Sequence, residues 1–386
     1  MAKRTANGTG HLRQRSDGRW EGQLLTPDGR RRSVYGKSQK EVRQKITQLQ
    51  SDIDNNAYIA PDKMTVGDWL DKWISDYCNN VKESTRDNYR GHITLHIKPA
   101  LGKVKLTALT PDMCQHFVND LKNKPGKGGK PMSAKTIKNI SGTLHESLRR
   151  AVKNRYIRFN PASDMDLPRI ERYELQPLDL PDIKLLMESL GDDLYSTIIK
   201  FALFTGCREG ECLGLRWSCV NFEDGTIRID LQLCRPRKHG DSYKLGSVKT
   251  DRVRVIRPAP YVMQLLKQQR QRQLEERLRA GNVWDDHGIP DLVFTTETGK
   301  YLCYQVLLRH LRKRLKASGL SEHRFHDLRD SFATTSIAIG DDAKTVQSNL
   351  GHYDAAFTLN RYCGFTDSMR KASSSRMEGF ISGISQ

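Results

Sequence analysis

The chain has 386 residues, which is longer than a domain with a single hydrophobic core usually is, so its length predicts two or three domains. Its 64 lysines and arginines outnumber 45 aspartates and glutamates, which gives a net charge of +19 and favours a nucleic-acid partner, although a basic protein without such a partner is the alternative. No run of about 18 apolar residues occurs, which excludes a membrane-spanning helix. The N-terminus lacks the apolar stretch of a secretory signal, so we expect a cytoplasmic protein with no membrane partner.

The cysteine pattern argues against a metal centre. No two cysteines form a CxxC pair or stand at a zinc spacing. We therefore expect reduced, mostly buried thiols and no metal or other cofactor. The eight cysteines are Cys78, Cys114, Cys207, Cys212, Cys219, Cys234, Cys303 and Cys363.

Residues 1–60 predict a small three-stranded sheet followed by a helix. Segments 11–15, 19–25 and 31–35 have the composition of short strands, and Ser-Asp-Gly and Pro-Asp-Gly turns separate them. A serine and a glutamate at 38 and 41 form a capping box at the start of a helix. Apolar residues at helical spacing then supply one face of this helix: Val42, Ile46, Leu49 and Ile53.

Residues 64–157 predict an all-helical unit. The first helix begins near Thr65, and further helices are expected around 84–96, 110–122 and 137–151. A glycine-rich basic loop precedes the last of them. The first helix carries aromatic residues at helical spacing, which we assign to the core rather than to base stacking: Trp69, Trp73 and Tyr77.

Residues 174–386 form the largest block, predicted to be mostly helical with a small antiparallel sheet. A buried helix at 198–204 ends at a glycine. Alternating apolar and polar residues predict a strand over 227–233, with further strands at 253–256 and 292–294. The whole chain is therefore predicted to be an α+β, multidomain protein.

Four segments of this block offer groups suited to breaking a phosphodiester without a metal. Such a reaction needs cations for the non-bridging oxygens, a nucleophile, and a proton donor for the leaving oxygen. Arginine suits the first role because its planar fork binds phosphate oxygens in pairs and stays charged. The segments are TGCREGE at 205–211, KT at 249–250, HDLR at 326–329, and LGH at 350–352 followed by RY at 361–362.

Each group also has an ordinary structural interpretation. Arg208 could be the ion-pair partner of Glu211, and Lys249 could be a solvated side chain. His326 and Arg329 stand at an i, i+3 spacing that many helices show by chance. A single tyrosine near a C-terminus is usually a packing residue. The occurrence of all the segments in one block, in this order, favours the functional interpretation.

The order of the motifs resembles the tyrosine recombinase (phage integrase) family, including integrases of phages and Tn916-like conjugative transposons. The resemblance covers the whole C-terminal block and extends to HDLRDSFAT at 326–334. It implies an arm-type DNA-binding domain at 1–60, a helical core-binding domain at 64–157 and a catalytic domain at 174–386. It also implies site-specific cutting and rejoining of DNA strands during integration and excision of a mobile element.

The resemblance implies a role for each matching residue. Tyr362 would attack the scissile phosphate and form a 3′-phosphotyrosyl bond, while Arg208 and Arg329 clamp the phosphate. Asp330 and Cys363-Gly364 depart from the commonest family pattern, and neither departure removes a catalytic group.

Three further residues complete the implied site. Lys249 would be the general acid for the 5′ oxygen, His326 a general base or proton shuttle, and His352 a hydrogen-bond donor to the phosphate. Neither ATP nor a metal is then required, because the covalent bond conserves the energy of the phosphodiester.

The implied partners are double-stranded DNA at core and arm-type sites and further copies of the chain in a homotetramer. An excisionase and a DNA-bending helper would be additional partners that the sequence does not identify. Two alternatives are a type IB topoisomerase, against which the separate basic N-terminal unit argues, and a catalytically inactive DNA-binding protein, against which the full set of catalytic residues argues.

Overall fold

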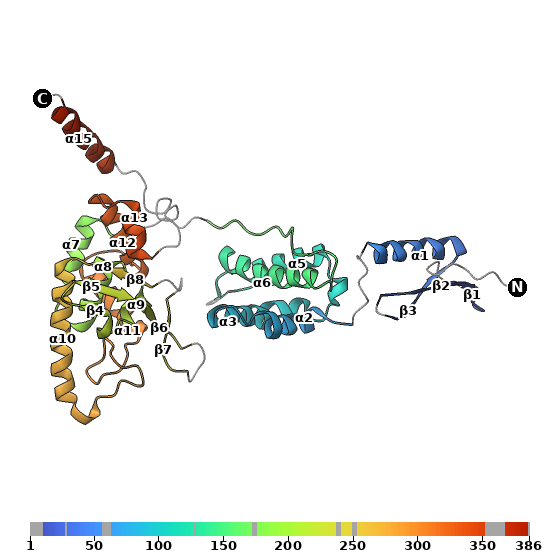
Figure 1. The fold of residues 1–386 in the computed structure, drawn as a ribbon, viewed down its shortest axis with the longest axis horizontal. Helices are drawn as coiled ribbons and strands as arrows, with labels where there is room; N and C mark the ends of the chain where they lie inside the picture. Colours follow the sequence, from blue (N-terminus) through green and yellow to red (C-terminus); the bar gives the residue numbers. More distant parts are fainter. Residues whose placement is uncertain are drawn as a thin grey trace. The chain divides into compact units, whose positions relative to one another are not determined.

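The computed structural model divides the chain into two compact units, Met1–Arg172 and Tyr173–Gln386 (Figure 1). Helices dominate both units, the first also holds one small antiparallel sheet and the second holds two, which confirms the predicted α+β, multidomain class. The structure describes residues 11–27, 29–55, 63–126, 129–171, 176–236, 241–248, 253–351 and 367–384.

A three-stranded antiparallel sheet and one helix form the N-terminal part of the first unit. The strands pair in chain order and the helix follows: β1 (His11–Gln14), β2 (Trp20–Leu25), β3 (Arg31–Gly36) and α1 (Gln39–Asp54). The hydroxyl of Ser38 accepts the N–H of Glu41 at 3.2 Å, as the capping pattern predicts. A Cβ atom at Gly22 would collide with Val42 and Ile46, so this glycine lets α1 pack closely against the sheet.

Helices fill the rest of the first unit. In chain order they are α2 (Val66–Lys72), α3 (Glu83–His92), α4 (Lys98–Leu101), α5 (Pro111–Asn123) and α6 (Ala134–Lys153), with a 3₁₀ turn at Leu106–Ala108. Thr65 and Asp68 exchange hydrogen bonds of 2.9 and 3.1 Å in a capping box at the start of α2. Trp69 is fully buried and donates its indole N–H to the Ser147 carbonyl at 3.1 Å, which confirms its assignment to the core. The predicted helix at 84–96 is α-helical only at first, because α3 continues into a π-helical turn at Ile93–Ile97. Helix α2 continues in the same way, into a π-helical turn at Trp73–Tyr77.

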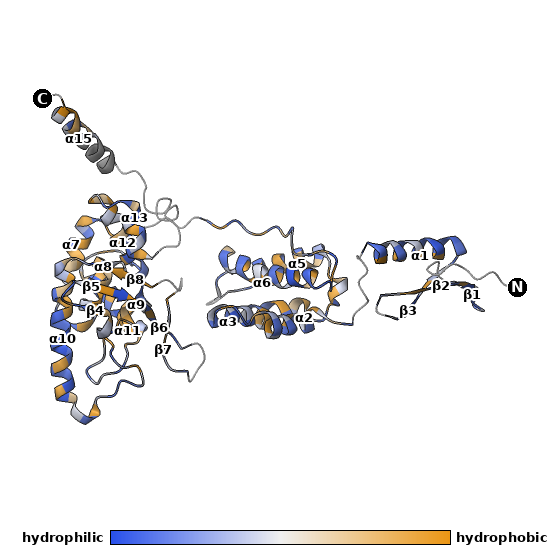
Figure 2. Cartoon of the chain, in the orientation of Figure 1, coloured by the Kyte–Doolittle hydropathy of each residue, from blue (hydrophilic) through white to orange (hydrophobic). Residues whose placement is uncertain are grey.

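The second unit is built around the buried helix α8. Its helices are α7 (Leu180–Ser189), α8 (Leu194–Thr205), α9 (Glu209–Leu213), α10 (Pro260–Ala280), α11 (Tyr304–Ala317), α12 (Phe325–Ala338), α13 (Ala343–Leu350) and α15 (Asp367–Ile384), with 3₁₀ turns at Trp217–Cys219 and Gly281–Val283. Helices α10, α11 and α12 all contact α8. Apolar residues gather where these elements meet (Figure 2), as burial of a common core requires.

The described residues of the second unit also form two small antiparallel sheets, which correct part of the strand prediction. One sheet has the order β4 (Val220–Asn221), β5 (Thr226–Ile229), β8 (Arg254–Ile256), and the other pairs β6 (Leu231–Cys234) with β7 (Lys244–Ser247). The prediction of one strand over 227–233 is wrong, because the chain changes sheets at Asp230, whose carboxylate accepts a 2.7 Å hydrogen bond from Arg216. The strand predicted at 292–294 is also wrong, since this segment makes only an isolated bridge from Leu292 to Arg216. Strands β4 and β7 have no counterpart among the predicted strands.

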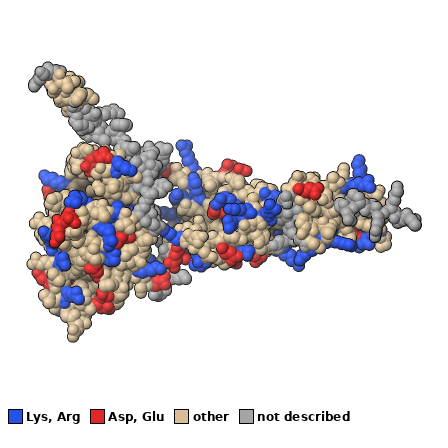
Figure 3. All heavy atoms as spheres, viewed as in Figure 1, with Lys and Arg blue, Asp and Glu red and all other residues tan. Residues whose placement is uncertain are grey.

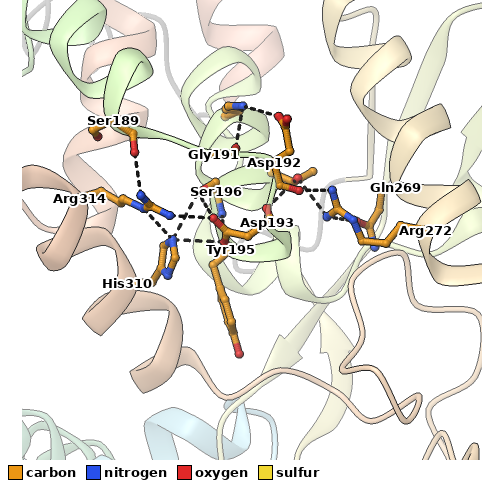
Figure 4. Close-up of polar contacts among 12 residues, drawn as sticks. Ser189, Gly191, Asp192, Asp193, Tyr195, Ser196, Gln269, Arg272, His310 and Arg314 are labelled. Carbon is orange, nitrogen blue, oxygen red and sulfur yellow. Dashed lines mark hydrogen bonds and ion pairs between the residues drawn. The ribbon is translucent and has the colours of Figure 1, made fainter. Parts of the chain in front are cut away.

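A polar cluster holds the start of α8 (Figure 4). The Asp193 carboxylate caps α8 by accepting the N–H of Ser196 at 3.0 Å. Arg314 on α11 donates to Asp193 and to the Ser189 carbonyl, both at 2.9 Å. Arg314 also donates its Nε–H to Nε2 of His310 at 3.2 Å, and the same nitrogen lies 3.3 Å from the Asp193 carboxylate. The cluster thus fixes the N-terminal end of α8.

This cluster predicts a loss of stability in mild acid. Burial lowers the pKa of His310 below its ordinary value of 6.5, although Asp193 opposes the shift. The unfolded chain therefore binds the proton more readily, and the free energy of unfolding should fall as pH drops through about 6.5. Urea denaturation at pH 7.5 and 5.5 measures the effect, and His310→Gln should reduce it. The exposed His116→Gln is the matched control. An unchanged pH dependence in His310→Gln would contradict the assignment.

Candidate active site

Two helices of the second unit end at glycines in the left-handed conformation. Helix α8 ends at Gly206 and α13 at Gly351, each with φ of 64°. A Cβ atom at Gly206 would lie 2.5 Å from the Phe332 ring and 2.6 Å from Leu350. Glycine is therefore required at position 206 both by the backbone and by the close packing of α8, α12 and α13. The ends of α8 and α13 also present backbone carbonyls that helical hydrogen bonds leave unsatisfied.

The buried side chain of Arg329 links these two helix ends. Arg329 belongs to the first turns of α12 and is only 1% exposed. Its Nη1 donates to the Gly206 carbonyl at 2.7 Å, and its Nη2 donates to the Leu350 carbonyl at 2.6 Å. The structure thereby brings together the TGCREGE, HDLR and LGH segments, which lie far apart in the sequence.

Arg208 stands at the start of α9, immediately after the turn at Gly206. The Glu211 carboxylate accepts the backbone N–H of Arg208 at 2.9 Å and its Nη1–H at 2.7 Å. The ion pair considered as the structural interpretation of Arg208 is therefore real. The arginine side chain remains 18% exposed, whereas the carboxylate is fully buried. Arg208 thus pairs with Glu211 while part of its side chain stays exposed.

Arg254 on β8 is part of the same cluster and was missed by the sequence analysis. It donates to both oxygens of Glu211, at 2.6 and 3.1 Å, and its Nε donates to the Asn349 carbonyl at 2.8 Å. Burial by itself would raise the pKa of Glu211, but the bonds and charges of Arg254 and Arg208 lower it to about 2. Glu211 is therefore ionised at neutral pH. The sequence signal for Arg254 was a charged residue in a strand with a hydrophobic pattern, where burial requires a partner.

The HDLRD segment divides between surface and interior. His326 is exposed at the start of α12, although it lies one turn from the buried Arg329. Asp327 is buried, accepts the backbone N–H of Arg324 at 2.7 Å and closes the first turn of α12. Burial would raise the pKa of Asp327, but the bonds from Arg324 outweigh that effect and lower it. Asp330, omitted from the predicted site, is 1% exposed.

Three predicted site residues, Lys249, His352 and Tyr362, lie outside the described residues. Their roles therefore stay predictions. Of the predicted residues that the structure does describe, Arg208 and Arg329 lie in one cluster. Arg329 binds the Gly206 carbonyl, two residues before Arg208, and Arg208 binds the Glu211 carboxylate. The described part of the site is thus an arginine-rich cluster around one buried carboxylate, which suits an anionic ligand.

The cysteines of the described part of the chain are all free thiols, five of them buried. Within the same residues, no group of three or more His, Cys, Asp or Glu side chains is placed to hold a metal ion. No described helix is both long enough and apolar enough to cross a membrane.

Comparisons with known proteins identify the family. Residues 179–368 match the phage integrase family, and residues 65–122 match the phage integrase N-terminal SAM-like domain. The chain is 30% identical over 349 residues to a XerC-like tyrosine recombinase of Caldanaerobacter subterraneus subsp. tengcongensis, covering 86% of this chain and 87% of the relative.

This chain belongs to the phage integrase family of tyrosine recombinases. It is a site-specific recombinase that cleaves and rejoins DNA strands, as its motifs predicted.

Solved structures agree on the fold. A Tn1549 transposon integrase in complex with a circular-intermediate DNA aligns with a TM-score of 0.67 at 22% identity, over 82% of this chain and 100% of that one. A lambda integrase tetramer bound to a Holliday junction aligns with a TM-score of 0.55 at 18% identity, over 89% and 96% of the two chains.

The close packing at Gly206 predicts a large cost for an added methyl group. Gly206→Ala should destabilise the second unit by about 1 kcal/mol from the left-handed backbone and by roughly 2 kcal/mol more from overpacking. Gly225→Ala is the matched control, because Gly225 has the same φ of 64° and nothing within 4 Å of an added Cβ. Urea denaturation of the recombinase measures both variants. Equal losses in the two would contradict the role of close packing.

Proposed function

We propose that this recombinase integrates and excises a mobile DNA element through a 3′-phosphotyrosyl bond at Tyr362. The observation that carries the proposal is the pair of hydrogen bonds from buried Arg329 to Gly206 and Leu350. These bonds support a single site to which the first, third and fourth motif segments all contribute.

In the proposed cleavage step, the phenolic oxygen of Tyr362 attacks phosphorus and the bond from phosphorus to the 5′ oxygen breaks. Arg208 and Arg329 stabilise the charge that grows on the non-bridging oxygens. The tyrosine proton passes to His326, and Lys249 supplies a proton to the leaving 5′ oxygen. Rejoining reverses these transfers with a 5′ hydroxyl from a second duplex.

The remaining contact to the phosphate is assigned to His352, as a hydrogen-bond donor. Arg208 suits its role because its side chain is partly exposed while Glu211 holds its backbone and one guanidinium nitrogen. The site needs no ATP, because one phosphodiester-like bond replaces another at every step.

Three domains would divide the DNA contacts: an arm-type domain at 1–60, a core-binding domain at 64–157 and the catalytic domain at 174–386. Figure 3 draws lysine and arginine side chains along the visible face of the first unit, which supports contact with a phosphate backbone. Exposed arginines on and around the N-terminal sheet support an arm-type site there: Arg13, Arg15, Arg19, Arg30 and Arg31. Two DNA sites on one chain raise the effective concentration of the second once the first is bound.

The nucleophile assignment predicts that Tyr362→Phe binds DNA but forms no covalent adduct. The substitution removes only the attacking oxygen, so phosphate contacts should persist. A nicked substrate carrying the recombination site traps the adduct, which a denaturing gel then separates, and a band-shift titration measures binding. Tyr353→Phe, in the same part of the chain, is the control and should retain adduct formation. Adduct formation by Tyr362→Phe would overturn the assignment.

The proposal includes assembly into a homotetramer on two DNA duplexes, acting in the cytoplasm, with an excisionase and a DNA-bending protein as helpers. Apolar side chains exposed along one face of α15 support contacts between copies: Met377, Phe380, Ile381 and Ile384. Their spacing of three and four residues places them on one side of the helix. Figure 2 shows apolar residues in the same C-terminal turns of α15.

Assembly should therefore depend on this face of α15. The double variant Phe380→Asp/Ile384→Asp places two charges on it and should reduce tetramers on paired sites, because charges are costly in an apolar contact. Sedimentation velocity of the DNA complexes measures the assembly. Ser375→Asp, on the opposite side of α15, is the matched control and should leave assembly unchanged. Intact tetramers in the double variant would contradict this part of the proposal.

A further inference from the structure

The guanidinium of Arg254 is almost wholly engaged by protein groups. Its side chain is 7% exposed, and it binds both oxygens of Glu211 as well as the Asn349 carbonyl. Its Nη2 also lies 3.8 Å from the buried Cys207 sulfur. A Cβ atom added at Gly351 would lie 3.0 Å from the Arg254 side chain, so the end of α13 packs directly against it.

Arg254 thereby pairs its charge with the buried Glu211 carboxylate, and little of its side chain faces solvent. Burial alone does not assign this task, because Arg329 is equally buried but donates to two backbone carbonyls. Arg208 differs from Arg254, because it shares the same carboxylate but keeps more of its side chain exposed. The two arginines therefore have different tasks around Glu211.

We propose that Arg254 is a positioning residue, which occupies Glu211 so that Arg208 stays available to the scissile phosphate and which holds the end of α13 through Asn349. This inference rests on the proposed function of Arg208. Glu211 forms ion pairs with Arg208 and Arg254. If Arg254 were lost, Arg208 would have to neutralise the buried carboxylate. Arg208 would turn toward the carboxylate and away from the DNA.

The segment that carries His352 begins directly after α13, so the second contact also bears on the site. The Arg254 bond to Asn349 and the Arg329 bond to Leu350 hold successive carbonyls at the end of this helix. From one strand, Arg254 thus connects the Glu211 side chain on α9 with the end of α13.

The test compares single-turnover cleavage of a nicked site by pre-bound protein with the dissociation constant for the same DNA. Arg254→Gln should lower the cleavage rate about 100-fold, as expected for a small displacement of a catalytic group, and change the dissociation constant by no more than about twofold. Arg254→Lys should recover part of the rate, because it keeps a cation beside Glu211.

A second variant distinguishes positioning from general support of the fold. Adding Glu211→Gln to Arg254→Gln removes the carboxylate that would capture Arg208, so the double variant should cleave faster than Arg254→Gln alone. A residue that merely supports the fold would give a double variant no faster than the single one.

The pH profile supplies an independent readout. Glu211 is faced by Arg208 and Arg254 and by the buried thiols of Cys207 and Cys212. Loss of Arg254 raises the pKa of Glu211 from about 2, so mild acid should neutralise the carboxylate and release Arg208. The cleavage rate of Arg254→Gln relative to the parent should therefore increase between pH 7.5 and 5.5.

Arg216→Gln is the matched control, because Arg216 and Arg228 share the Asp230 carboxylate in the same way, at 2.7 and 3.3 Å, outside the cluster of motif residues. It should cleave at the parental rate.

A parental rate in Arg254→Gln, or failure of the added Glu211→Gln substitution to restore any rate, would overturn the inference. If Arg254→Gln does not fold, as thermal unfolding would reveal, Arg254→Lys and Arg254→Lys/Glu211→Gln replace the pair: a faster double variant upholds the inference, and one no faster than Arg254→Lys refutes it. Absence of any adduct from the parent chain would instead refute the proposed function.

Discussion

Arginine side chains that satisfy the carbonyls at two helix ends hold the site together. Helix C-termini concentrate partial negative charge and leave carbonyls without helical partners. At α8 and α13 these carbonyls belong to Gly206, Asn349 and Leu350, and they are taken by Arg329 and Arg254. Each bond is charge-assisted and largely shielded from water, which makes it stronger than a neutral surface bond. The same contacts satisfy the helix ends and place the motif segments in one site.

The cluster also balances charge in a way that suits phosphate chemistry. Glu211 is fully buried and ionised, and two guanidinium groups share it. An unpaired carboxylate at such a position would be costly, so at least one arginine must remain with it. Because Arg254 meets that requirement from the interior, Arg208 can face an incoming anion. A residue outside the family motifs thereby affects one inside them.

Local patterns predicted much of the fold because they act within a few residues. The caps at Ser38 and Thr65 appear where their side chains could reach the next N–H groups. The glycine ending the helix at 198–204 adopts the left-handed conformation that its lack of a Cβ permits. The strand predictions failed where pairing partners decide the outcome. An unbroken alternation over 227–233 gave no sign that the chain changes sheets at Asp230, and residues 292–294 are apolar because they are buried, without belonging to a strand.

The sequence by itself determined the family and its chemistry, because ordered motifs of arginine, lysine, histidine and tyrosine carry reactivity in their side-chain types. It also predicted the small N-terminal sheet and the helical units, through short-range caps, turns and periodic apolar residues. Only the tertiary structure decided which buried cation partners which carbonyl or carboxylate. The partners of Arg254 on α9 and α13 lie 43 and 95 residues away in the chain, and no local pattern encodes a contact over that separation. The engagement of Arg254, and with it the relative freedom of Arg208, follows from the packing of β8 against α13, which places Arg254 beside the Glu211 carboxylate.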